Sequence, residues 1–390
     1  MSGRTLSLRT RVFICLVLVA IGAAALYLIF TTEPVAERET QTRQTAMLVE
    51  VTQAEQGDFH PTIQALGTVT AAQEITLTPR VAGEVVELSA AFDPGGFVRQ
   101  GDILVRIDEA DYRNVLAQRE SELQQAISNL EMEQGQSAKA EMDFEQLGKE
   151  VPEDRRSLIL REPQLRSAEA AVQSARAAVD QARLDLERTA VRAPFDAQVL
   201  SREVNLGSQV ASGDPLARLA GVDTYWVETT IPLDKLRWLS FYDNRQEVPS
   251  AVRIAHRTAW DEGQERVGYL YRLIGELEGE TRLARVLVAV DDPLALSAAS
   301  PNEPALMIGT YVECFIEGRE IADALRLRRE YVRNDDTVWL MRNGALAIQP
   351  VDVLFRDADY AYIRGGLEAG DQVVITSLST VREGVPLRLN

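Results

Sequence analysis

The feature that most constrains the fold of this chain is a block of helical sequence, from about residue 109 to 188, inside a chain that is otherwise rich in strand-like segments. The block has neither glycine nor proline between Glu109 and Gln134. In its second half, apolar residues recur at alternating spacings of three and four, at Leu165, Ala168, Val172, Ala175, Val179, Ala182 and Leu186. This alternation is typical of a coiled-coil seam, so we expect a helix that packs along one narrow face.

The first half of the block predicts a partner for that helix. Residues repeat every seven positions at Leu116, Leu123, Leu130, Ser137 and Phe144, with Ala126, Ala140 and Leu147 between them. Pro152 disfavours one continuous helix, and Asp154 can cap the next one. We therefore expect an antiparallel helical hairpin that turns near residues 150–155, with arms of roughly 50 to 60 Å. The simpler alternative is a coiled coil at a membrane surface that only dimerises.

A short β motif occurs once before and once after this hairpin. Each copy has a strand followed by the pattern G-x-x-V-x-x-G-D-x-L, in which Gly-Asp is a tight-turn signal. The strands begin at Gly83-Glu84-Val85 and Ala197-Gln198-Val199, and the patterns run over residues 95–104 and 207–216. Two half-motifs this far apart in the sequence are expected to pair with each other. The hairpin is then an insertion between them.

These halves resemble the two halves of a lipoyl or biotinyl carrier domain, a small flattened β-barrel. A carrier enzyme attaches its cofactor to a lysine at the turn between the halves. Here the helical insert replaces that turn, and Lys139 and Lys149 lie within the insert. The resemblance therefore predicts the carrier fold without its cofactor.

The N-terminal segment predicts a membrane anchor. Arg4, Arg9 and Arg11 precede an uncharged run over residues 12–30, long enough to cross a bilayer. The arginines favour a cytoplasmic N-terminus. A cleaved signal peptide with a site near Ala23-Ala24-Ala25 is the alternative, but the apolar run continues beyond that point. A polar tether over residues 31–45 follows.

Composition excludes several classes of function. The net charge of −18 argues against a nucleic-acid partner and against broad binding to anionic lipid surfaces. Two cysteines and two histidines are too few for a disulfide framework or a histidine metal cluster. The acidic runs, such as residues 276–280, are typical of solvated loops, and the few methionines form no cluster for a soft metal. We expect no catalytic residues, no metal and no cofactor.

With the hairpin, the split carrier-like halves and the anchor together, residues 46–390 resemble the membrane fusion proteins of tripartite efflux, the HlyD-like superfamily of periplasmic adaptors. The segment Val191-Arg192-Ala193-Pro194-Phe195-Asp196 is similar to the R-A-P-F-D-G signature of that family, with Ala197 in place of its glycine. Residues 306–312 are similar to its L-x-P-G-M-x-V motif, with Ile308 in place of proline. Residues 366–374 and the Asn343-Gly344 turn resemble its last domain.

The resemblance implies a mainly β, elongated multi-domain adaptor with a long α-helical coiled-coil hairpin. Its parts are built from discontinuous segments. We expect an N-terminal transmembrane anchor and tether (1–45), a membrane-proximal β domain (46–57 and 318–390), a β-barrel (58–70 and 222–317), a lipoyl-like domain (71–108 and 189–221) and the hairpin (109–188). Trp226, Trp238, Trp260 and Trp339 are expected to pack in the β-domain cores.

The resemblance also implies a contact site at the hairpin tip. Adaptors that meet TolC-like channels carry arginine, leucine and serine at positions i, i+4 and i+11, and Arg156, Leu160 and Ser167 have this spacing. On one continuous helix the three side chains fall within about 40° of one another, roughly 110° away from the seam. Leu160 would fill a groove between channel helices, Arg156 would donate to carbonyls or carboxylates, and Ser167 would allow close approach. The alternative is three ordinary surface residues.

The partners implied are an inner-membrane transporter of the resistance-nodulation-division (RND) type, a TolC-like outer-membrane channel, and further copies of the chain in a trimeric or hexameric ring. The chain would be anchored once in the inner membrane with its bulk in the periplasm. The export of drugs or other small molecules would be driven by the transporter. An adaptor for an ABC-type exporter and a stand-alone envelope scaffold remain as alternatives.

Overall fold

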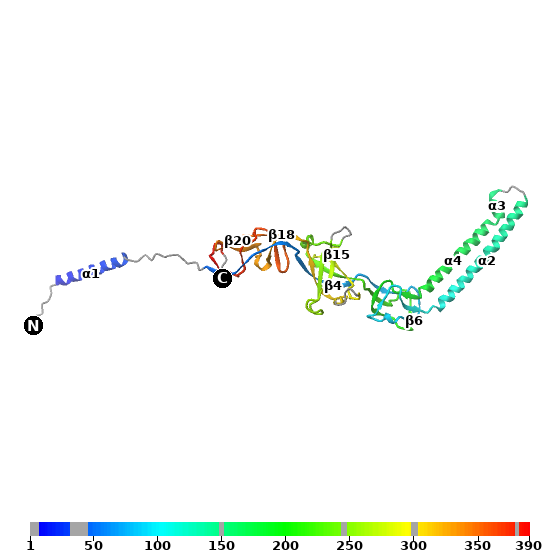
Figure 1. Ribbon diagram of the computed structural model, residues 1–390, viewed down its shortest axis with the longest axis horizontal. Coiled ribbons are helices and arrows are strands. Elements are labelled where there is room, and N and C mark those ends of the chain that lie inside the picture. The colour runs from blue at the N-terminus through cyan, green and yellow to red at the C-terminus, as the bar shows by residue number, and fades with distance from the viewer. Residues whose placement is uncertain (1–7, 32–45, 148–151, 243–247, 298–302, 379–381) are drawn as a thin grey trace. The chain divides into compact units, whose positions relative to one another are not determined.

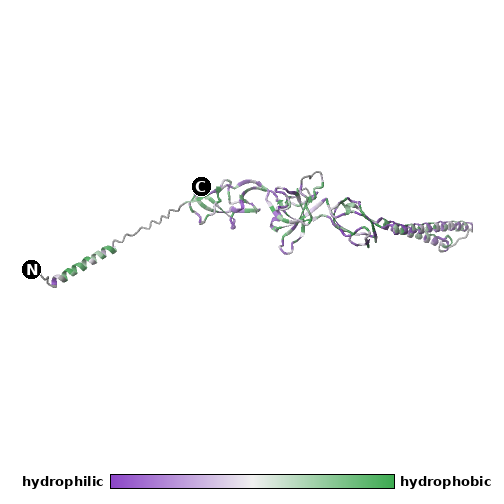
Figure 2. Ribbon diagram, turned by 90° about the horizontal axis from the view of Figure 1, so that it is seen from below, coloured by the Kyte–Doolittle hydropathy of each residue, from purple (hydrophilic) through white to green (hydrophobic). Residues whose placement is uncertain are grey.

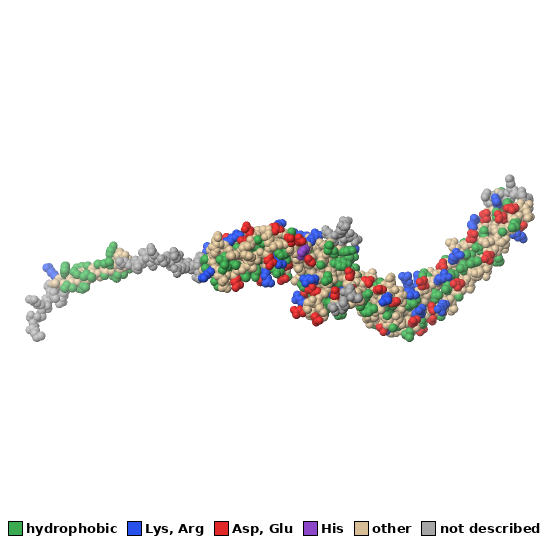
Figure 3. All heavy atoms as spheres, in the orientation of Figure 1, with side chains coloured by type: hydrophobic (Ala, Val, Ile, Leu, Met, Phe, Trp, Pro, Cys, Tyr) green, Lys and Arg blue, Asp and Glu red, His purple; other side chains and the backbone are tan. Residues whose placement is uncertain are grey.

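The computed structural model describes residues 8–31, 46–147, 152–242, 248–297, 303–378 and 382–390. Arg4, residues 32–45 of the expected tether, and residues 150–151 of the expected turn lie outside these ranges. Near the N-terminus, α1 (Leu8–Thr31) is the one described helix apolar and long enough to cross a membrane, over Val12–Thr31. Figure 2 colours most of this helix as hydrophobic, and Figure 3 shows apolar side chains along the face in view, as expected for a segment that crosses a lipid bilayer.

The two β half-motifs fold together around one core. Two four-stranded sheets form, in the orders β5-β12-β10-β7 and β11-β6-β8-β9. The strands are β5 (Glu74–Leu77), β6 (Gly83–Leu88), β7 (Phe97–Val98), β8 (Ile103–Ile107), β9 (Ala190–Arg192), β10 (Ala197–Arg202), β11 (Gln209–Val210) and β12 (Ala217–Gly221). Phe92, Leu104, Val199 and Leu216 are buried in the shared core, together with residues from both copies. This is the expected lipoyl-like fold, and the hairpin leaves from it between β8 and β9 (Figure 1).

Six strands close into a barrel in the order β13-β16-β15-β14-β17-β4. Their bounds are β4 (Thr62–Ala71), β13 (Thr224–Ile231), β14 (Ala251–Ala255), β15 (Arg266–Leu277), β16 (Ala284–Asp291) and β17 (Tyr311–Glu317). Along β13, Tyr225, Val227 and Ile231 are buried, because alternate residues of a strand face the barrel interior. Trp226 therefore lies on the opposite face, where it stacks on Tyr271. The expectation that Trp226 packs in the core is wrong for this reason.

A four-stranded sheet in the order β21-β22-β18-β3 belongs to the same compact unit as the barrel. Its strands are β3 (Glu55–Phe59), β18 (Ile321–Arg328), β21 (Asp352–Arg356) and β22 (Tyr360–Gly365). Trp238, from the short helix η2 (Leu233–Trp238), packs edge-on against Phe355 with ring centroids 5.7 Å apart. The Tyr362 hydroxyl donates to the buried Asp357 carboxylate at 2.7 Å. Burial and this carboxylate raise the pKa of Tyr362, so the phenol stays protonated as a donor.

A second compact unit holds the remaining strands. One sheet has the order β2-β23-β19-β20, and β1 pairs in parallel with β24. The bounds are β1 (Met47–Val49), β2 (Val51–Thr52), β19 (Thr337–Arg342), β20 (Ala345–Pro350), β23 (Val373–Val374) and β24 (Leu387–Leu389). Asn343 and Gly344 join β19 to β20 with φ of 53° and 75°, the positive values that a two-residue hairpin turn requires. The predicted Asn-Gly hairpin is confirmed.

The helical block folds as the expected antiparallel hairpin, with α2 (Ala110–Leu147) beside α4 (Glu162–Glu187) and a short α3 (Glu153–Ile159) between them. At 38 residues, α2 reaches about 57 Å. The start of α3 corrects one expectation. Pro152 occupies the N-cap position and the helix begins at Glu153, so Asp154 is a helical residue and not the N-cap residue. Proline suits this place because the first residues of a helix need no N–H partner.

Candidate functional site

The hairpin seam lies where the apolar spacing predicted it. On α4, Val179 and Ala182 are buried, and Leu165, Ala168, Val172, Ala175 and Leu186 are half-buried. On α2, the predicted positions Leu116, Leu123, Leu130, Ser137 and Phe144 are all half-buried. Most other described positions on both helices are exposed. The many alanines of the seam allow the two backbones to approach closely, and the outer faces stay available to partners.

The second arm of the hairpin is broken near the tip. Helix α3 ends at Ile159, Leu160 follows as its cap, and Arg161 takes the left-handed conformation with φ of 61° and ψ of 23°. Helix α4 then begins at Glu162, with Pro163 as its second residue. Proline lacks the N–H that would bond to the carbonyl of Ile159, and its ring would clash with that carbonyl in a continuous helix. The chain therefore changes direction at residues 160–161.

Two side chains of α2 hold this break in place. The Arg161 guanidinium donates two hydrogen bonds to the Glu133 carboxylate, with Nε–Oε1 at 2.6 Å and Nη2–Oε2 at 3.0 Å. The Ser137 hydroxyl donates to the backbone oxygen of Leu160 at 2.7 Å. We call Glu133, Ser137 and Arg161 the clasp. Left-handed backbone at a residue other than glycine costs of order 1 kcal/mol, so the clasp offsets a conformation that arginine does not favour.

The clasp has electrostatic consequences for both partners. The hydrogen bond from Arg161 is the largest influence on Glu133 and lowers the pKa of its carboxyl. The reciprocal hydrogen bond raises the pKa of Arg161. Both effects favour the charged pair at neutral pH, because a bidentate guanidinium–carboxylate contact stabilises the ionised forms.

The break corrects the geometry expected for the tip residues. Arg156 lies on α3, Leu160 lies in the break and Ser167 lies on α4, so the three are not on one continuous helix. Arg156 and Ser167 are exposed, and Leu160 is half-buried with its carbonyl engaged by Ser137. The Arg156 guanidinium lies 5.9 Å from the Phe144 ring centroid on α2. The angular spread of about 40°, which holds for one continuous helix, therefore does not apply to these three side chains.

Glu133 and Arg161 were not predicted from the sequence, although one signal for the break was present. The residue before a proline avoids helical backbone, so Glu162-Pro163 indicates a helix boundary close to that found. Nothing local marks Glu133 as the partner. It lies 28 residues before Arg161, and only the antiparallel pairing of the helices brings the two together.

At the base of the hairpin, the two copies of the β motif exchange hydrogen bonds. The Gly95 N–H donates to the Val199 carbonyl of the second copy at 2.8 Å, and the Gly207 N–H donates to the Val85 carbonyl of the first copy at 2.8 Å. In the reverse direction, Val199 donates to Gly96 and Val85 donates to Ser208, both at 2.9 Å. Neither half can satisfy its backbone alone, which confirms the predicted pairing of the half-motifs.

The Gly-Asp turns of the two copies are closed in the same way. The Asp102 carboxylate accepts from the Arg99 N–H, and the Asp214 carboxylate accepts from the Ala211 N–H, both at 2.8 Å. Gly101 and Gly213, just before these aspartates, have φ of 87° and 96°. In the R-A-P-F-D segment, the Asp196 carboxylate accepts from the Gln100 N–H at 2.7 Å, which ties the segment after the hairpin to the first turn.

The described residues include no group of three histidine, cysteine or acidic side chains that could hold a metal ion. Lys139 lies within α2 and is exposed, and Lys149 lies outside the described residues. The arrangement can support docking through a long pair of helices that extends from the β unit, whose two halves are joined by backbone hydrogen bonds.

Comparison with known proteins agrees with this geometry. Residues 73–220, which hold the hairpin and both β half-motifs, match the family model for the barrel-sandwich hybrid domain of RND membrane fusion proteins. The multidrug resistance protein MdtA of Klebsiella pneumoniae is 26% identical over 340 residues, covering 84% of this chain and 76% of that protein. MdtA of Escherichia coli K12 is 24% identical over 342 residues, with the same coverage of both chains.

Solved structures support the fold. MacA from Actinobacillus actinomycetemcomitans has a TM-score of 0.58 at 16% identity and covers 84% of this chain and 99% of its own. A chimera of MacA with the α-hairpin domain of Pseudomonas aeruginosa MexA has a TM-score of 0.55 at 19% identity, covering 83% and 100%. The family is one of adaptors and not of enzymes. With the barrel, the split lipoyl-like unit and the hairpin in this order, the chain is similar to RND membrane fusion proteins, the adaptors of RND-type efflux, and its residues 73–220 match their barrel-sandwich hybrid domain.

Proposed function

We propose that the chain is the periplasmic adaptor that joins an RND transporter of the inner membrane to a TolC-like channel of the outer membrane, in the export of drugs or other small molecules. The observation that carries this proposal is the match of residues 73–220 to RND membrane fusion proteins across the whole hairpin and both β half-motifs. The names of the similar MdtA proteins support multidrug export as the process.

In this proposal α1 is an uncleaved anchor in the inner membrane. The apolar stretch Val12–Thr31 follows Arg9 and Arg11, which favours an N-terminus in the cytoplasm and the rest of the chain in the periplasm. The functional parts are those expected from the sequence: a membrane-proximal domain, a barrel, the lipoyl-like domain and the hairpin. Several copies would form a ring around the export path, as a trimer or hexamer.

The hairpin tip is the proposed contact with the channel, through Arg156, Leu160 and Ser167. The exposed Arg156 on α3 is available to carbonyls or carboxylates of a partner. Because the break separates the three residues, the contact would involve two short surfaces, one on α3 with Leu160 and one on α4 at Ser167. The clasp would keep the relative position of these two surfaces fixed.

Site-specific photo-crosslinking in native membranes tests the proposal. One crosslinker replaces Leu158, which is 61% exposed on α3 beside Leu160. A second replaces Ala259, which is exposed next to Trp260 on the barrel, and a control replaces Val115, which is 46% exposed near the start of α2 at the base of the hairpin. We expect capture of a TolC-like channel at position 158 but not at 115, and of an RND transporter at position 259. Capture of an ABC permease at position 259 would indicate a different energy source. Failure to capture an outer-membrane protein at position 158 would contradict the tip contact.

A charge reversal separates the adaptor from a stand-alone scaffold. Arg156→Asp is expected to raise drug susceptibility to that of a strain lacking the chain, while the amount of chain in the membrane stays unchanged. Arg176→Asp is the matched control, because Arg176 is also an exposed arginine of the second arm and lies beyond Ser167 toward the base of the hairpin, outside the proposed contact. Unchanged resistance with Arg156→Asp would favour the scaffold.

A further inference from the structure

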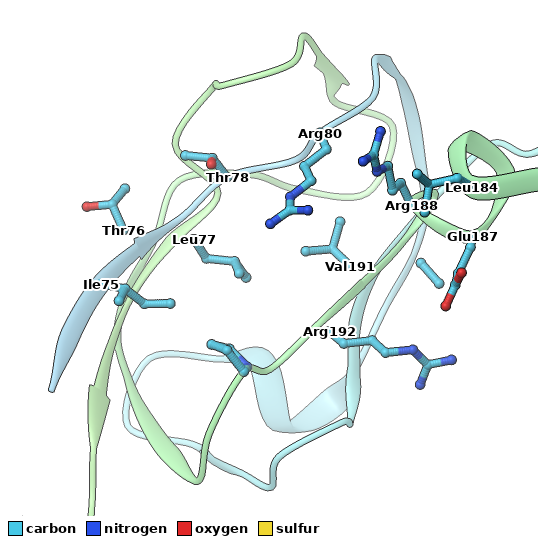
Figure 4. A pocket seen from close by; sticks show the side chains of 12 residues that line it. Ile75, Thr76, Leu77, Thr78, Arg80, Leu184, Glu187, Arg188, Val191 and Arg192 are labelled. Atoms are coloured by element: carbon cyan, nitrogen blue, oxygen red, sulfur yellow. The ribbon is translucent and has the colours of Figure 1, made fainter. Parts of the chain in front are cut away.

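A cavity of about 480 Å³ opens where the hairpin joins the lipoyl-like unit. One wall comes from β5 and the residues after it, and the other comes from the end of α4 and from β9. Its size falls within the range of about 300 to 1,000 Å³ that is usual for small-molecule sites. Figure 4 shows the side chains that line it. No part of the proposed docking function uses this cavity.

The floor of the cavity is apolar. Leu77 and Val191 are almost fully buried, at 7% and 8% exposure, and Ile75 is half-buried beside them. Leu184 and Pro194 add apolar surface at the sides, and Leu184 remains 40% exposed although it lies on α4 near the seam. Covering such a surface with an apolar group removes it from water and lowers the free energy.

The rim carries an excess of positive charge. Arg80, Arg188 and Arg192 line the cavity, against one acidic side chain, Glu187. In Figure 4 the Arg80 guanidinium extends inward toward Leu77 and Val191, whereas Arg192 and Glu187 point away. Arg80 is exposed, and the structure shows it no carboxylate partner among the described residues. The rim is therefore a local region of positive charge in a chain whose net charge is −18.

Arg188 has a donor without a partner. Its Nη1 donates to Asp185 at 3.1 Å, but its Nε is buried and makes no hydrogen bond within the described residues. A buried N–H without an acceptor is unfavourable, so a polar ligand that supplies an acceptor would be favoured here. Arg188 also caps the C-terminus of α4, whose dipole is negative, and part of its charge is offset there. The inward-pointing charge of Arg80 is therefore needed to attract an anion.

We propose that this cavity binds an amphiphilic monoanion, with an aromatic or aliphatic body on Leu77 and Val191 and a carboxylate or sulfonate head between Arg80 and Arg188. A fork of guanidinium donors suits such a head group. An acidic side chain of a second copy would satisfy the arginines but would leave the apolar floor uncovered, so a small molecule fits the cavity better. The site lies within this chain alone, and its occupation does not depend on the identity of the transporter or channel.

Isothermal titration of the full chain in nonionic detergent tests the site with naphthalene-2-sulfonate. Naphthalene-2-sulfonamide has the same shape without the charge and serves as the neutral probe. We expect saturable binding of one sulfonate per chain, and a rise of roughly tenfold in Kd with Arg80→Gln or Arg188→Gln. Arg176→Gln, at an exposed α4 position that does not line the cavity, is the matched control and also reports binding to the micelle. The sulfonamide is expected to bind weakly and equally to every variant.

Other outcomes overturn the site. Equal binding of sulfonate and sulfonamide would mean that the arginines take no part, and sulfonate binding unchanged by Arg80→Gln would place the probe elsewhere. If the probe does not bind and the arginine variants instead shift the oligomeric state in sedimentation velocity, the arginines meet acidic groups of a second copy and the small-molecule site is wrong. Arg80→Lys keeps the charge and is expected to retain most of the affinity. Arg80 is exposed in the loop after β5, so its variants test the site even if Arg188→Gln does not fold.

Discussion

Arg161 and Glu133 form a bidentate ion pair across the hairpin, with the arginine in left-handed backbone and the carboxylate side chain only 16% exposed. The pair joins the start of α4 to the middle of α2, at the point where the second arm is broken. With the hydrogen bond from Ser137 to the Leu160 carbonyl, it determines where α3 leaves the line of α4. The direction of the tip is thus set by side chains from the opposite arm.

Loss of the clasp is expected to loosen α3. Spin labels at Lys139 on α2 and Leu158 on α3, both exposed, report their separation by electron–electron double resonance in a Cys15→Ser chain. Arg161→Asn and Glu133→Gln should broaden the distance distribution. Asparagine tolerates left-handed backbone but cannot reach Glu133, so it removes the ion pair while keeping the turn. A distribution as narrow as that of the parent chain would show that Pro163 alone sets the break.

The same measurement has a predicted pH dependence. The pKa of Glu133 is lowered from its ordinary value of 4.5 by the hydrogen bond from Arg161. A lowered pKa means that the clasp is fully present above the ordinary value and is lost as the pH falls through the folded pKa. We expect a constant distance at neutral and mildly acidic pH and broadening only at more acidic pH. Glu133→Gln should be broad at every pH, and a parent chain that broadens at neutral pH would contradict this assignment.

Substitution of glycine by alanine is expected to destabilise the fold at two β turns and to stabilise it inside α2. Gly101 and Gly213 have φ of 87° and 96°, with open space where a Cβ would lie, so alanine brings backbone strain of about 1 to 2 kcal/mol without a clash. Gly135 lies inside α2, also with open space, so alanine should stabilise the helix by about 1 kcal/mol. Hydrogen exchange read by mass spectrometry should show faster exchange around β7 or β11 in the first case and slower exchange along α2 in the second. A change of the exchange rate in the same direction in both cases would contradict the assignment of the turns.

The buried Arg266 of β15 is expected to hold the barrel closed at one end. Its side chain is 2% exposed; Nη2 donates to the carbonyls of Asp291 and Asp292 at 3.1 and 2.6 Å, and Nη1 pairs with Glu303 at 2.8 Å. Arg266→Met leaves these acceptors without a partner and should destabilise the barrel by about 3 kcal/mol. Arg272→Met on the exposed part of the same strand is the matched control. A melting temperature equal to that of the control would show that water replaces the guanidinium without cost.

The thiol of Cys314 is expected to be inert in the folded chain. It is fully buried in the barrel core, and burial raises its pKa from 9.0 to about 12. The thiol therefore stays protonated at pH 8.5, and thiolate reagents should modify a Cys15→Ser chain only after unfolding. Since the folded pKa lies above the unfolded one, this group contributes stability that is lost as the pH rises above 9. Rapid modification of the native chain would mean that the barrel opens readily.

Much of the fold could be predicted because its signals are local. The spacing of Leu165 to Leu186 determined the hairpin and its seam, since one apolar stripe on a helix can be buried only against another. Asn343-Gly344 and the Gly101 and Gly213 turns were readable because few residues adopt positive φ without strain. The paired half-motifs followed from their repetition, which implies two incomplete units that complete each other.

The tertiary structure alone decided how the tip is held and which atoms join distant segments. Arg156, Leu160 and Ser167 have a spacing that implies one helix, but the break at Arg161 divides them between α3 and α4. Glu133 became part of the site only when the antiparallel arms brought it to Arg161, and Arg266 became a buried anchor only when the barrel closed around it. Periodicity and turn chemistry depend on neighbours along the chain, whereas these contacts depend on register between segments far apart in sequence, which packing of the whole unit determines.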